Sequence, residues 1–394
     1  GGGVLKLSKS VLLKGGTLYT ITQGILEKAD ILVEDGIIKD IGEGYKISND
    51  VEVIDVTGYI ITPGFIDPHT HIGLIEEGYP EDEESVNEAT NPITPHLRVI
   101  DAVNPYDRAF DDALLGGVTT VQVLPGSANV LGGQGAVIKT YGKIIDDMVR
   151  KFPSGMKAAF GENPKNLYRK KDRSPATRMA VAAILREALI SAQDYERKKI
   201  EAEREGKTFD RDMKREALLP VLNRELPLRI HAHRADDILT AIRIADEFNI
   251  KFTLEHGTEG DKISGLLAER QIPVAYGPAI TSRSKLELQN RSWEGAVKQF
   301  RQGVRLCFTT DHPVVPINHL VLQASLAASA GIPQGDALAS ITIKAAEHIG
   351  MEDQLGSIDK GKVADLLVWG GDPLDYMSHI LMVMVEGEVV IRRD

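Results

Sequence analysis

Residues 64–71 read Gly64-Phe65-Ile66-Asp67-Pro68-His69-Thr70-His71, a short apolar run that ends in two histidines. In a β-strand, side chains two positions apart point to the same face, so His69 and His71 are expected to project side by side. Two neutral imidazoles on one face form a clamp for a divalent transition metal. A solvated or hydrogen-bonded histidine pair near a strand end is the alternative interpretation, and the rest of the chain has to decide between the two.

Three further strand ends carry side chains of the same kind. An apolar strand gives way to polar loop residues at Ile230-His231-Ala232-His233, at Leu254-Glu255-His256-Gly257 and at Thr309-Thr310-Asp311-His312-Pro313. In a barrel of parallel strands, the carboxyl ends of the strands are where active sites are built. Four strand ends that offer His or Asp in order are difficult to explain by packing alone, so the pattern favours a metal site.

Short strands alternate with helical segments between residues 63 and 350. Eight strands are expected, at 64–69, 118–123, 136–140, 155–160, 228–232, 252–255, 273–275 and 306–310. Helical periodicity follows or separates them, for example at 178–204, 237–247 and 320–328. This pattern predicts an α/β fold with a (β/α)8 barrel, a TIM barrel. A doubly wound open sheet is the alternative, but no Gly-x-Gly-x-x-Gly follows the first strand.

Both ends of the chain lack this alternation. Residues 4–62 contain short β-rich runs with a hairpin turn signal at Asp35-Gly36, and β-rich runs return after residue 364. We therefore expect one small β-sandwich domain, built from residues 1–62 plus 351–394, beside a barrel domain of residues 63–350.

The composition limits the partners and the location of the protein. A net charge of −11 over 394 residues argues against nucleic acid, because phosphate binding relies on clustered Lys and Arg. Cys307 is the single cysteine, which excludes an internal disulfide and favours a reducing compartment. No run approaches ~20 apolar residues and no signal-peptide pattern is present, so we expect a cytoplasmic protein without a membrane partner. We expect a small-molecule substrate, and the sequence is compatible with a homo-oligomer.

The chain resembles the amidohydrolase superfamily of metal-dependent barrel hydrolases, and the resemblance runs over essentially its whole length. Its most specific motifs are Pro63-Gly64-Phe65-Ile66-Asp67-Pro68-His69-Thr70-His71, Glu255-His256-Gly257, Thr310-Asp311-His312 and Gly356-Ser357-Ile358-Asp359-Lys360-Gly361-Lys362-Val363-Ala364-Asp365-Leu366. Within the superfamily it is most similar to the branch that contains imidazolonepropionase. In that family the two termini form a small β-sandwich beside the barrel, in agreement with the pattern above.

The resemblance implies a site for one or two divalent ions, with zinc expected. It assigns His69 and His71 to the more buried ion together with Asp311, and it assigns His231 and His256 to a second ion or to the flank of a one-ion site. His233 has no fixed role in the family. His312 is expected to be structural, and the remaining histidines match no motif and are expected at the surface or in packing positions: His96, His319, His348 and His379.

The group that bridges the two ions has two candidates. Many two-metal relatives use a carbamylated lysine on the fourth strand, and Lys157 in Gly155-Met156-Lys157-Ala158-Ala159-Phe160 stands at a suitable position. A lysine in a packed strand is otherwise an uncompensated buried charge. Other relatives use a glutamate, and Glu162 follows the same strand. A single-metal site without a bridge is the third possibility.

The implied reaction is hydrolysis of a C–N bond in a cyclic amide, an N-acyl amino acid or a dipeptide-like substrate. A divalent ion would activate water and polarise the scissile carbonyl. Asp311 would carry the proton of that water to the leaving nitrogen, and His233 would help to stabilise the oxyanion. Asn129 and Gln134, beside the glycine-rich stretch 131–140, are candidate substrate contacts, since that stretch lacks the Gly-Lys pair of a phosphate-binding loop.

Two other functions are compatible with the motifs. A deaminase on the same scaffold would attack an amidine-type carbon in place of a carbonyl and release ammonia. A non-catalytic relative would keep the fold as a structural or interaction protein. Such a relative is expected to lose ligands, whereas this chain keeps the full set.

Overall fold

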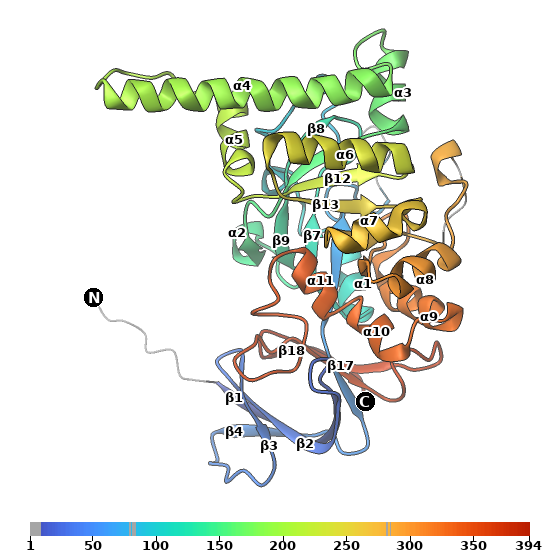
Figure 1. The fold of residues 1–394 in the computed structure, drawn as a ribbon. Coiled ribbons are helices and arrows are strands. Elements are labelled where there is room, and N and C mark those ends of the chain that lie inside the picture. The colour runs from blue at the N-terminus through green and yellow to red at the C-terminus, as the bar shows by residue number, and fades with distance from the viewer. Residues whose placement is uncertain (1–8, 79, 81–83, 281–282, 284) are drawn as a thin grey trace.

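A computed structural model describes the chain except for residues 1–8, 79, 81–83, 281–282 and 284. Figure 1 shows an α/β body with a separate sheet at its base, into which both ends of the chain run. The sequence has an acidic run after the first barrel strand, Glu81-Asp82-Glu83-Glu84, and residues 81–83 of it lie outside the described residues.

The separate sheet contains strands from both termini. Its strand order is β18-β17-β16-β5-β1-β2-β3, with β4 paired to β1. The bounds are β1 Ser10–Tyr19, β2 Ile25–Glu34, β3 Ile37–Gly42, β4 Val51–Asp55, β5 Ile60–Pro63, β16 Leu366–Trp369, β17 Ile380–Val385 and β18 Glu388–Arg392. The composite sheet predicted from the β-rich runs is therefore confirmed. The expected domain boundaries stay a prediction.

The sheet has its own apolar core. Leu13, Ile31, Ile61 and Met384 are among the buried residues of this core. The β2–β3 turn has φ of 52° at Asp35 and 80° at Gly36, the left-handed pair that a tight hairpin requires. A Cβ on Gly36 would lie 2.7 Å from the Glu386 carbonyl oxygen, so this close approach of the two turns depends on glycine.

The barrel is built mainly from parallel strands. They are β6 Phe65–Thr70, β7 Val118–Val123, β11 Met156–Ala159, β12 Leu228–Ala232, β13 Phe252–His256, β14 Pro273–Tyr276 and β15 Arg305–Phe308. β6 pairs with β7, and β11 to β15 pair in sequence order, all in parallel. Near β15 and β6, the Thr309 hydroxyl donates to the His69 carbonyl oxygen at 2.7 Å and His71 N–H donates to the His312 carbonyl oxygen at 2.8 Å. The predicted α/β fold is confirmed.

One predicted barrel strand runs in the wrong direction. Residues 136–140 form β9 Ala136–Lys139, which pairs antiparallel with β7, and β8 Leu131–Gln134 pairs antiparallel with β11. The twelve residues between β7 and β9 contain β8 and no helix that could cross over to a parallel position, so the chain returns antiparallel. Gly135 lies between β8 and β9, which belong to different sheets of the barrel. Its N–H donates to the Gly155 carbonyl oxygen at 2.9 Å.

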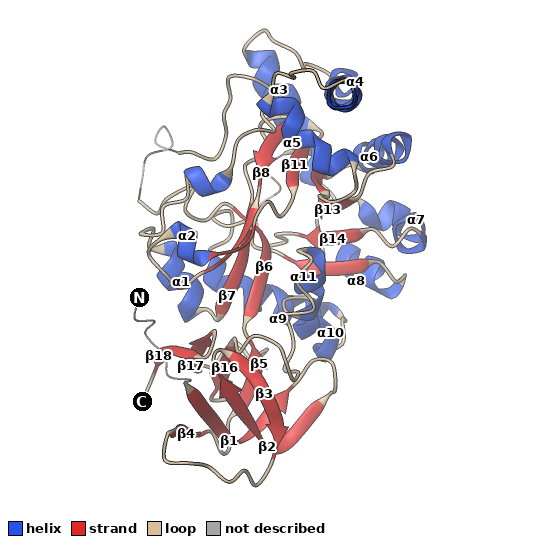
Figure 2. Ribbon diagram, turned by 90° about the vertical axis from the view of Figure 1, so that its left-hand side faces the viewer, coloured by secondary structure: helices blue, strands red, loops and turns tan. Residues whose placement is uncertain are grey.

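Helices cover the outside of the barrel (Figure 2). They are α1 Ala109–Leu115, α2 Ile145–Met148, α3 Glu162–Lys170, α4 Arg178–Arg204, α5 Met213–Leu222, α6 Ala235–Phe248, α7 Ser264–Glu269, α8 Trp293–Arg301, α9 Leu320–Ala330, α10 Gln334–Ala339 and α11 Ile343–His348. No helix in the described part of the chain combines the length and the apolar character that a membrane crossing requires.

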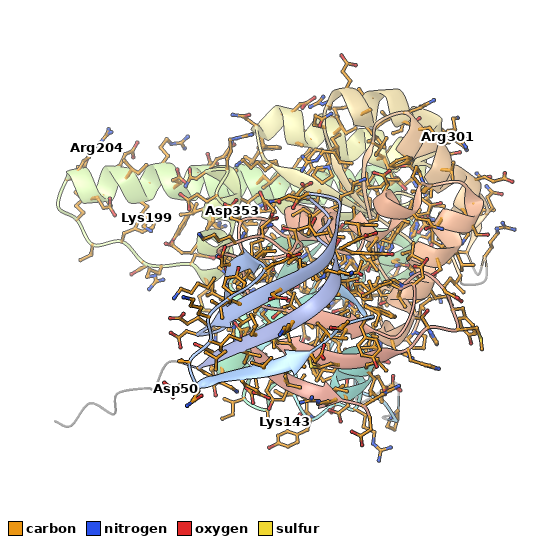
Figure 3. All side chains as sticks on the ribbon, turned by 90° about the horizontal axis from the view of Figure 1, so that it is seen from below. Asp50, Lys143, Lys199, Arg204, Arg301 and Asp353 are labelled. Atoms are coloured by element: carbon orange, nitrogen blue, oxygen red, sulfur yellow. The ribbon has the colours of Figure 1, made fainter. Side chains whose placement is uncertain are left out.

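The long helix α4 is anchored along only part of its length. Its buried residues end at Tyr195, and the charged remainder with Lys199 and Arg204 extends beyond the body (Figures 1 and 3). Its bounds agree with the predicted helix at 178–204. The amphipathic stripe that packs against α5 and α6 therefore fixes the helix as far as Tyr195, and a charged segment forms the remainder.

Candidate metal centre

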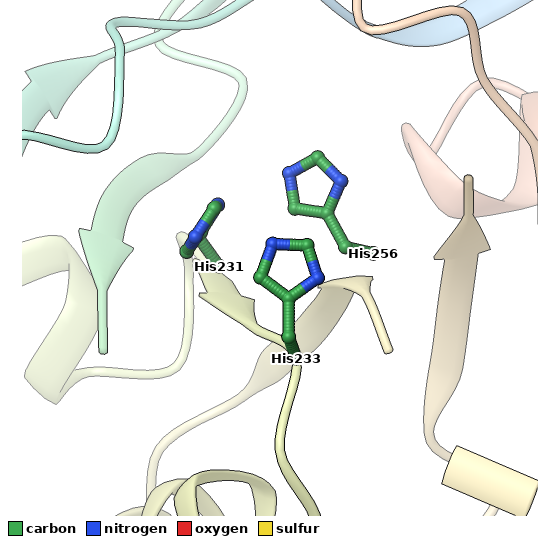
Figure 4. A group of neighbouring side chains, drawn as sticks. All are labelled: His231, His233 and His256. Carbon is green, nitrogen blue, oxygen red and sulfur yellow. The ribbon is translucent and has the colours of Figure 1, made fainter. Parts of the chain in front are cut away.

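The predicted ligands gather at the carboxyl ends of the barrel strands. Two groups of three residues each bring one ligand atom per residue within 4.8 Å of the others: His231, His233 and His256, and His69, His256 and Asp311. Figure 4 shows the first group, in which the three rings converge. His256 belongs to both groups, and the His69 and His71 ring centroids are 5.4 Å apart. The strand periodicity of the His-x-His pairs therefore produces a single cluster.

Hydrogen bonds fix the orientation of the rings. His71 Nδ1 donates to the Leu124 carbonyl oxygen at 2.8 Å, and His256 Nδ1 donates to the Gly277 carbonyl oxygen at 2.7 Å. Burial lowers the pKa of both imidazoles, that of His256 to about 3, so the rings are neutral near pH 7. A neutral imidazole whose Nδ1 carries the proton has a lone pair on Nε2. Both Nε2 atoms are thereby prepared as metal ligands.

The contact between His71 and Asp311 places two acceptors against each other. His71 Nε2 lies 2.9 Å from Asp311 Oδ1, and His69 Nε2 lies 3.3 Å from the same oxygen. With its proton on Nδ1, the neutral His71 ring has nothing to donate to this carboxylate. A cation between such atoms would convert a repulsive contact into a favourable one.

His231 is the second indication that a cation fits here. Its side chain is buried, and neither ring nitrogen has a hydrogen-bond partner among the described residues. Burial lowers the pKa of this ring well below its ordinary value, so protonation does not resolve the problem. Buried polar atoms normally find a partner. The donor set of imidazoles with one carboxylate therefore fits a divalent transition metal.

The two candidate bridging residues lie in different places. Lys157 on β11 is fully buried, with Nζ 3.4 Å from His69 Nε2, and burial lowers its pKa to about 8. Glu162 is the first residue of α3, and its Oε1 accepts a hydrogen bond from Glu287 N–H at 3.2 Å. Among the described residues, Lys157 reaches the cluster, whereas Glu162 belongs to neither ligand group. The Glu162 carboxylate is turned to the loop that follows β14 in this structure, and the choice between the two bridging residues stays a prediction.

The two predicted substrate contacts are held by the protein itself. Asn129 is buried, donates to the Glu88 carbonyl oxygen at 2.8 Å and to Thr94 Oγ1 at 2.9 Å, and accepts from the Tyr168 hydroxyl at 2.6 Å. Gln134 donates to the Pro95 carbonyl oxygen at 3.0 Å. Neither residue lines the cavity above the histidines. In this structure both amides hold the segment 88–95 to β8 and its preceding loop, and their role as substrate contacts stays a prediction.

The family model described as "Amidohydrolase family" matches residues 60–390, which include both ligand groups and part of the terminal sheet. The chain belongs to the amidohydrolase family. The crystal structure of an amidohydrolase from Thermotoga maritima MSB8 superposes with a TM-score of 0.95 at 45% identity, covering 97% of this chain and all of the other.

Two curated relatives extend this assignment. "Amidohydrolase tasK" of Hapsidospora irregularis is 28% identical over 91% of this chain, and this chain spans 39% of that protein's length. An imidazolonepropionase of Mesorhizobium japonicum is 26% identical over 88% of this chain and 87% of its own length. The predicted resemblance to the amidohydrolases is therefore confirmed.

The amidohydrolase cluster rests on a second layer of buried polar residues that sequence reasoning missed. Glu255 Oε1 lies 3.5 Å from His69 Nδ1, and Glu255 Oε2 accepts from His348 Nε2 at 2.8 Å. Asp67 accepts from the hydroxyls of Thr309 and Thr310 at 2.6 and 2.5 Å. Asp67 stands two residues before His69, and Glu255 stands one residue before His256. This spacing in the sequence could have indicated that both carboxylates lie close to the ligands.

The other histidines occupy structural or solvent positions. His348, expected at the surface or in packing, is buried against Glu255. His312 Nδ1 accepts from Ile317 N–H at 3.1 Å, consistent with its expected structural role. His319 and His379 are exposed.

A cavity of about 580 Å³ opens directly above the amidohydrolase cluster. This volume is typical of a small-molecule site. It is lined by His71, Ile75, Glu84, Val86, Asn87, Gly126, Ser127, Asn163, His231, His233, His256, Lys285, Leu288, Arg291, Asp311, Pro313 and Val314. The ligand groups thus face a space that a substrate can enter.

Proposed function

We propose that this amidohydrolase hydrolyses a C–N bond in a cyclic amide, an N-acyl amino acid or a dipeptide-like substrate with water activated by a divalent metal. The observation that carries the proposal is the facing pair of acceptors at His71 and Asp311, beside a buried His231 that has no hydrogen-bond partner among the described residues. This arrangement is costly without a cation and favourable with one.

The residues that would hold the metal are the two ligand groups and His71. His69, His71 and Asp311 would hold the deeper ion, and His231 and His256 would hold the second, with His233 as a further nitrogen ligand. Lys157 is the candidate bridge, since its ammonium is already beside His69. The predominance of imidazole nitrogen supports zinc. An ion held there would supply activated water and polarise the scissile carbonyl.

The chain's own groups then supply the proton chemistry. Asp311 faces the cavity at the end of β15 and has the carboxylate needed to accept a proton and return it to the leaving nitrogen. His233 also lines the cavity, and its Nδ1 is held by Thr258 Oγ1 at 2.7 Å, so its Nε2 side is available to the site. The names of the two curated relatives, an amidohydrolase and an imidazolonepropionase, support hydrolysis as the reaction type.

Metal analysis combined with a hydrolysis screen tests the proposal. We expect one or two divalent ions per purified chain, with loss of at least one in His231→Ala. We expect Asp311→Asn to lower turnover by about 10²- to 10⁴-fold, because it removes the proton carrier. His379→Ala, which changes an exposed histidine of the terminal sheet, is the matched control and should keep both metal and turnover.

Three results would contradict the proposal in different ways. Protein that contains no metal before and after mutation of His69 would favour a non-catalytic scaffold. Ammonia release from amidine-type substrates without amide hydrolysis would assign a deaminase. Wild-type turnover in Asp311→Asn would remove Asp311 from the reaction.

A further inference from the structure

We propose that the substrate carries a carboxylate, which Lys285 and Arg291 hold beside the histidine cluster. This inference rests on the proposed function and selects N-acyl amino acids and dipeptide-like compounds from its candidate substrates, over neutral cyclic amides.

Lys285 and Arg291 belong to the same segment, which follows β14 and contains the short helix Leu286–Leu288. Both side chains line the cavity that His231, His233 and Asp311 line from below. Arg291 is 7% exposed, and Lys285 is partly buried. Two cations therefore form one wall of a cavity whose base is the metal centre.

The immediate partner of Lys285 is neutral. Its ammonium donates to the Asn163 side-chain oxygen, and Asn163 Nδ2 in turn donates to Ser127 Oγ at 2.6 Å. Among the described residues Lys285 forms no ion pair with a carboxylate, although Asn163 and Ser127 both line the same cavity. The Lys285 charge is thus positioned by an amide and is not neutralised by direct contact.

The carboxylates near Lys285 act on it through their charge: Glu287, Glu162 and Asp311 each favour its protonated form, although none forms an ion pair with it among the described residues. Asp311 faces His69 and His71, and Glu84 is exposed to solvent. Burial lowers the pKa of Lys285 and of Arg291, which reflects the cost of keeping both cations away from water. At Lys285, whose direct partner is an amide, a bound anion would offset this cost further.

The two cations would bind a carboxylate in different ways. Arginine binds a carboxylate through two parallel hydrogen bonds, and lysine adds a point charge. One carboxylate matches this pair better than a dianionic phosphate, because Asp311 and Glu84 also face the cavity.

Matched substrate pairs test the inference. The metal-loaded enzyme is compared on N-acetyl derivatives of alanine, leucine and proline and on the corresponding carboxamides, which differ by one charge. We expect kcat/KM to favour the acids by about 10- to 100-fold, the range of one or two hydrogen bonds to charged groups. Lys285→Met and Arg291→Met should each reduce that ratio toward one, mainly through KM for the acid, while Lys285→Arg should retain most of it. Lys298→Met, an exposed lysine of α8 outside the cavity, is the control.

Calorimetric binding of the same acids and carboxamides gives an independent readout. Binding of the acids that weakens at least tenfold in Lys285→Met supports the inference even if no compound is hydrolysed, in which case the proposed function alone fails. Equal kcat/KM for acids and carboxamides, with metal present, overturns the inference and leaves the proposed function intact. Failure of the acids to bind also overturns it.

Discussion

Glu255 is a buried carboxylate beside His69. It lies between His69 Nδ1 and His348 Nε2, and although burial opposes its ionisation, His348 and His69 lower its pKa. We predict that Glu255→Gln lowers metal affinity by roughly 10- to 100-fold, as is typical when a residue behind a metal ligand is changed. Titration of metal-depleted protein against a competing chelator measures this affinity.

The matched control for Glu255 is Glu347→Gln, which changes an exposed carboxylate next to His348 in the chain. It should bind metal like the wild type. Equal metal affinity in Glu255→Gln and Glu347→Gln would show that His69 is oriented without Glu255.

The ligands and the residues behind them differ in how far sequence can predict them. The residues at positions 69, 71, 231 and 256 share a local pattern, because strand periodicity and strand ends are readable without a fold. His348 lies 93 positions from Glu255 and has no local signature, so only the folded barrel reveals its role. Asn129 shows where local pattern is ambiguous, since a polar residue beside a glycine-rich stretch can be a substrate contact or a structural amide, and here its amide bonds to the protein.

At the scale of elements, the segment after β14 is joined to the start of α3 by reciprocal hydrogen bonds. Glu162 N–H donates to Glu287 Oε2 at 3.0 Å, and Glu287 N–H donates to Glu162 Oε1 at 3.2 Å. Burial raises the pKa of Glu287 from 4.5 to about 7. The native state therefore holds this proton more tightly than the unfolded chain does. The stability that protonated Glu287 contributes is fully present below about pH 4.5. This contribution falls as the pH rises toward 7, and it does not change further at higher pH.

We predict that Glu287→Gln removes this pH dependence and stabilises the protein at pH 8. The pKa shift corresponds to at most roughly 3 kcal/mol, and Arg178, 3.6 Å from Glu287 Oε2, reduces the gain because it favours the charged form. Melting temperatures between pH 5 and 8 measure the effect, with Glu294→Gln on exposed α8 surface as the control. A variant that melts like the wild type at pH 8 and higher at pH 5 would contradict the assigned sign.

Elements were predictable where local pattern alone determines them. The observed bounds of β12 and α4 agree with the predicted ranges 228–232 and 178–204, since an apolar run and a periodic stripe define them. The direction of β9 was not predictable in this way, because pairing depends on how the chain returns from β7. The strand β8 was missed, since Leu131-Gly132-Gly133-Gln134 has little β-propensity and is held by its partners.

At the scale of the molecule, one buried ion pair connects the barrel to the terminal sheet. Lys139 on β9 donates to Asp365 Oδ2 at 2.6 Å and to Thr120 Oγ1 at 2.9 Å. Asp365 Oδ1 accepts from Glu386 N–H at 2.8 Å, and its carbonyl oxygen accepts from Gly64 N–H at 2.8 Å. Because Gly64 leads directly into the strand that carries His69, this contact positions the terminal sheet against the base of the site strand.

We predict that Lys139→Met destabilises the protein by about 3–5 kcal/mol, because it leaves the Asp365 carboxylate buried without its cation. The double variant Lys139→Met/Asp365→Asn should recover more than half of the loss, since no charge is then buried and the Asn oxygen can still accept from Glu386 N–H. Lys39→Met is the control, because the Lys39–Glu34 pair is largely exposed and should contribute no more than ~1 kcal/mol. Denaturant midpoints of the wild type, the two single variants and the double variant measure these differences in the free energy of unfolding. If the double variant is no more stable than Lys139→Met, the packing of the lysine stem and not the buried charge connects the sheet to the barrel. Metal content measured on the same samples shows whether this connection also positions His69.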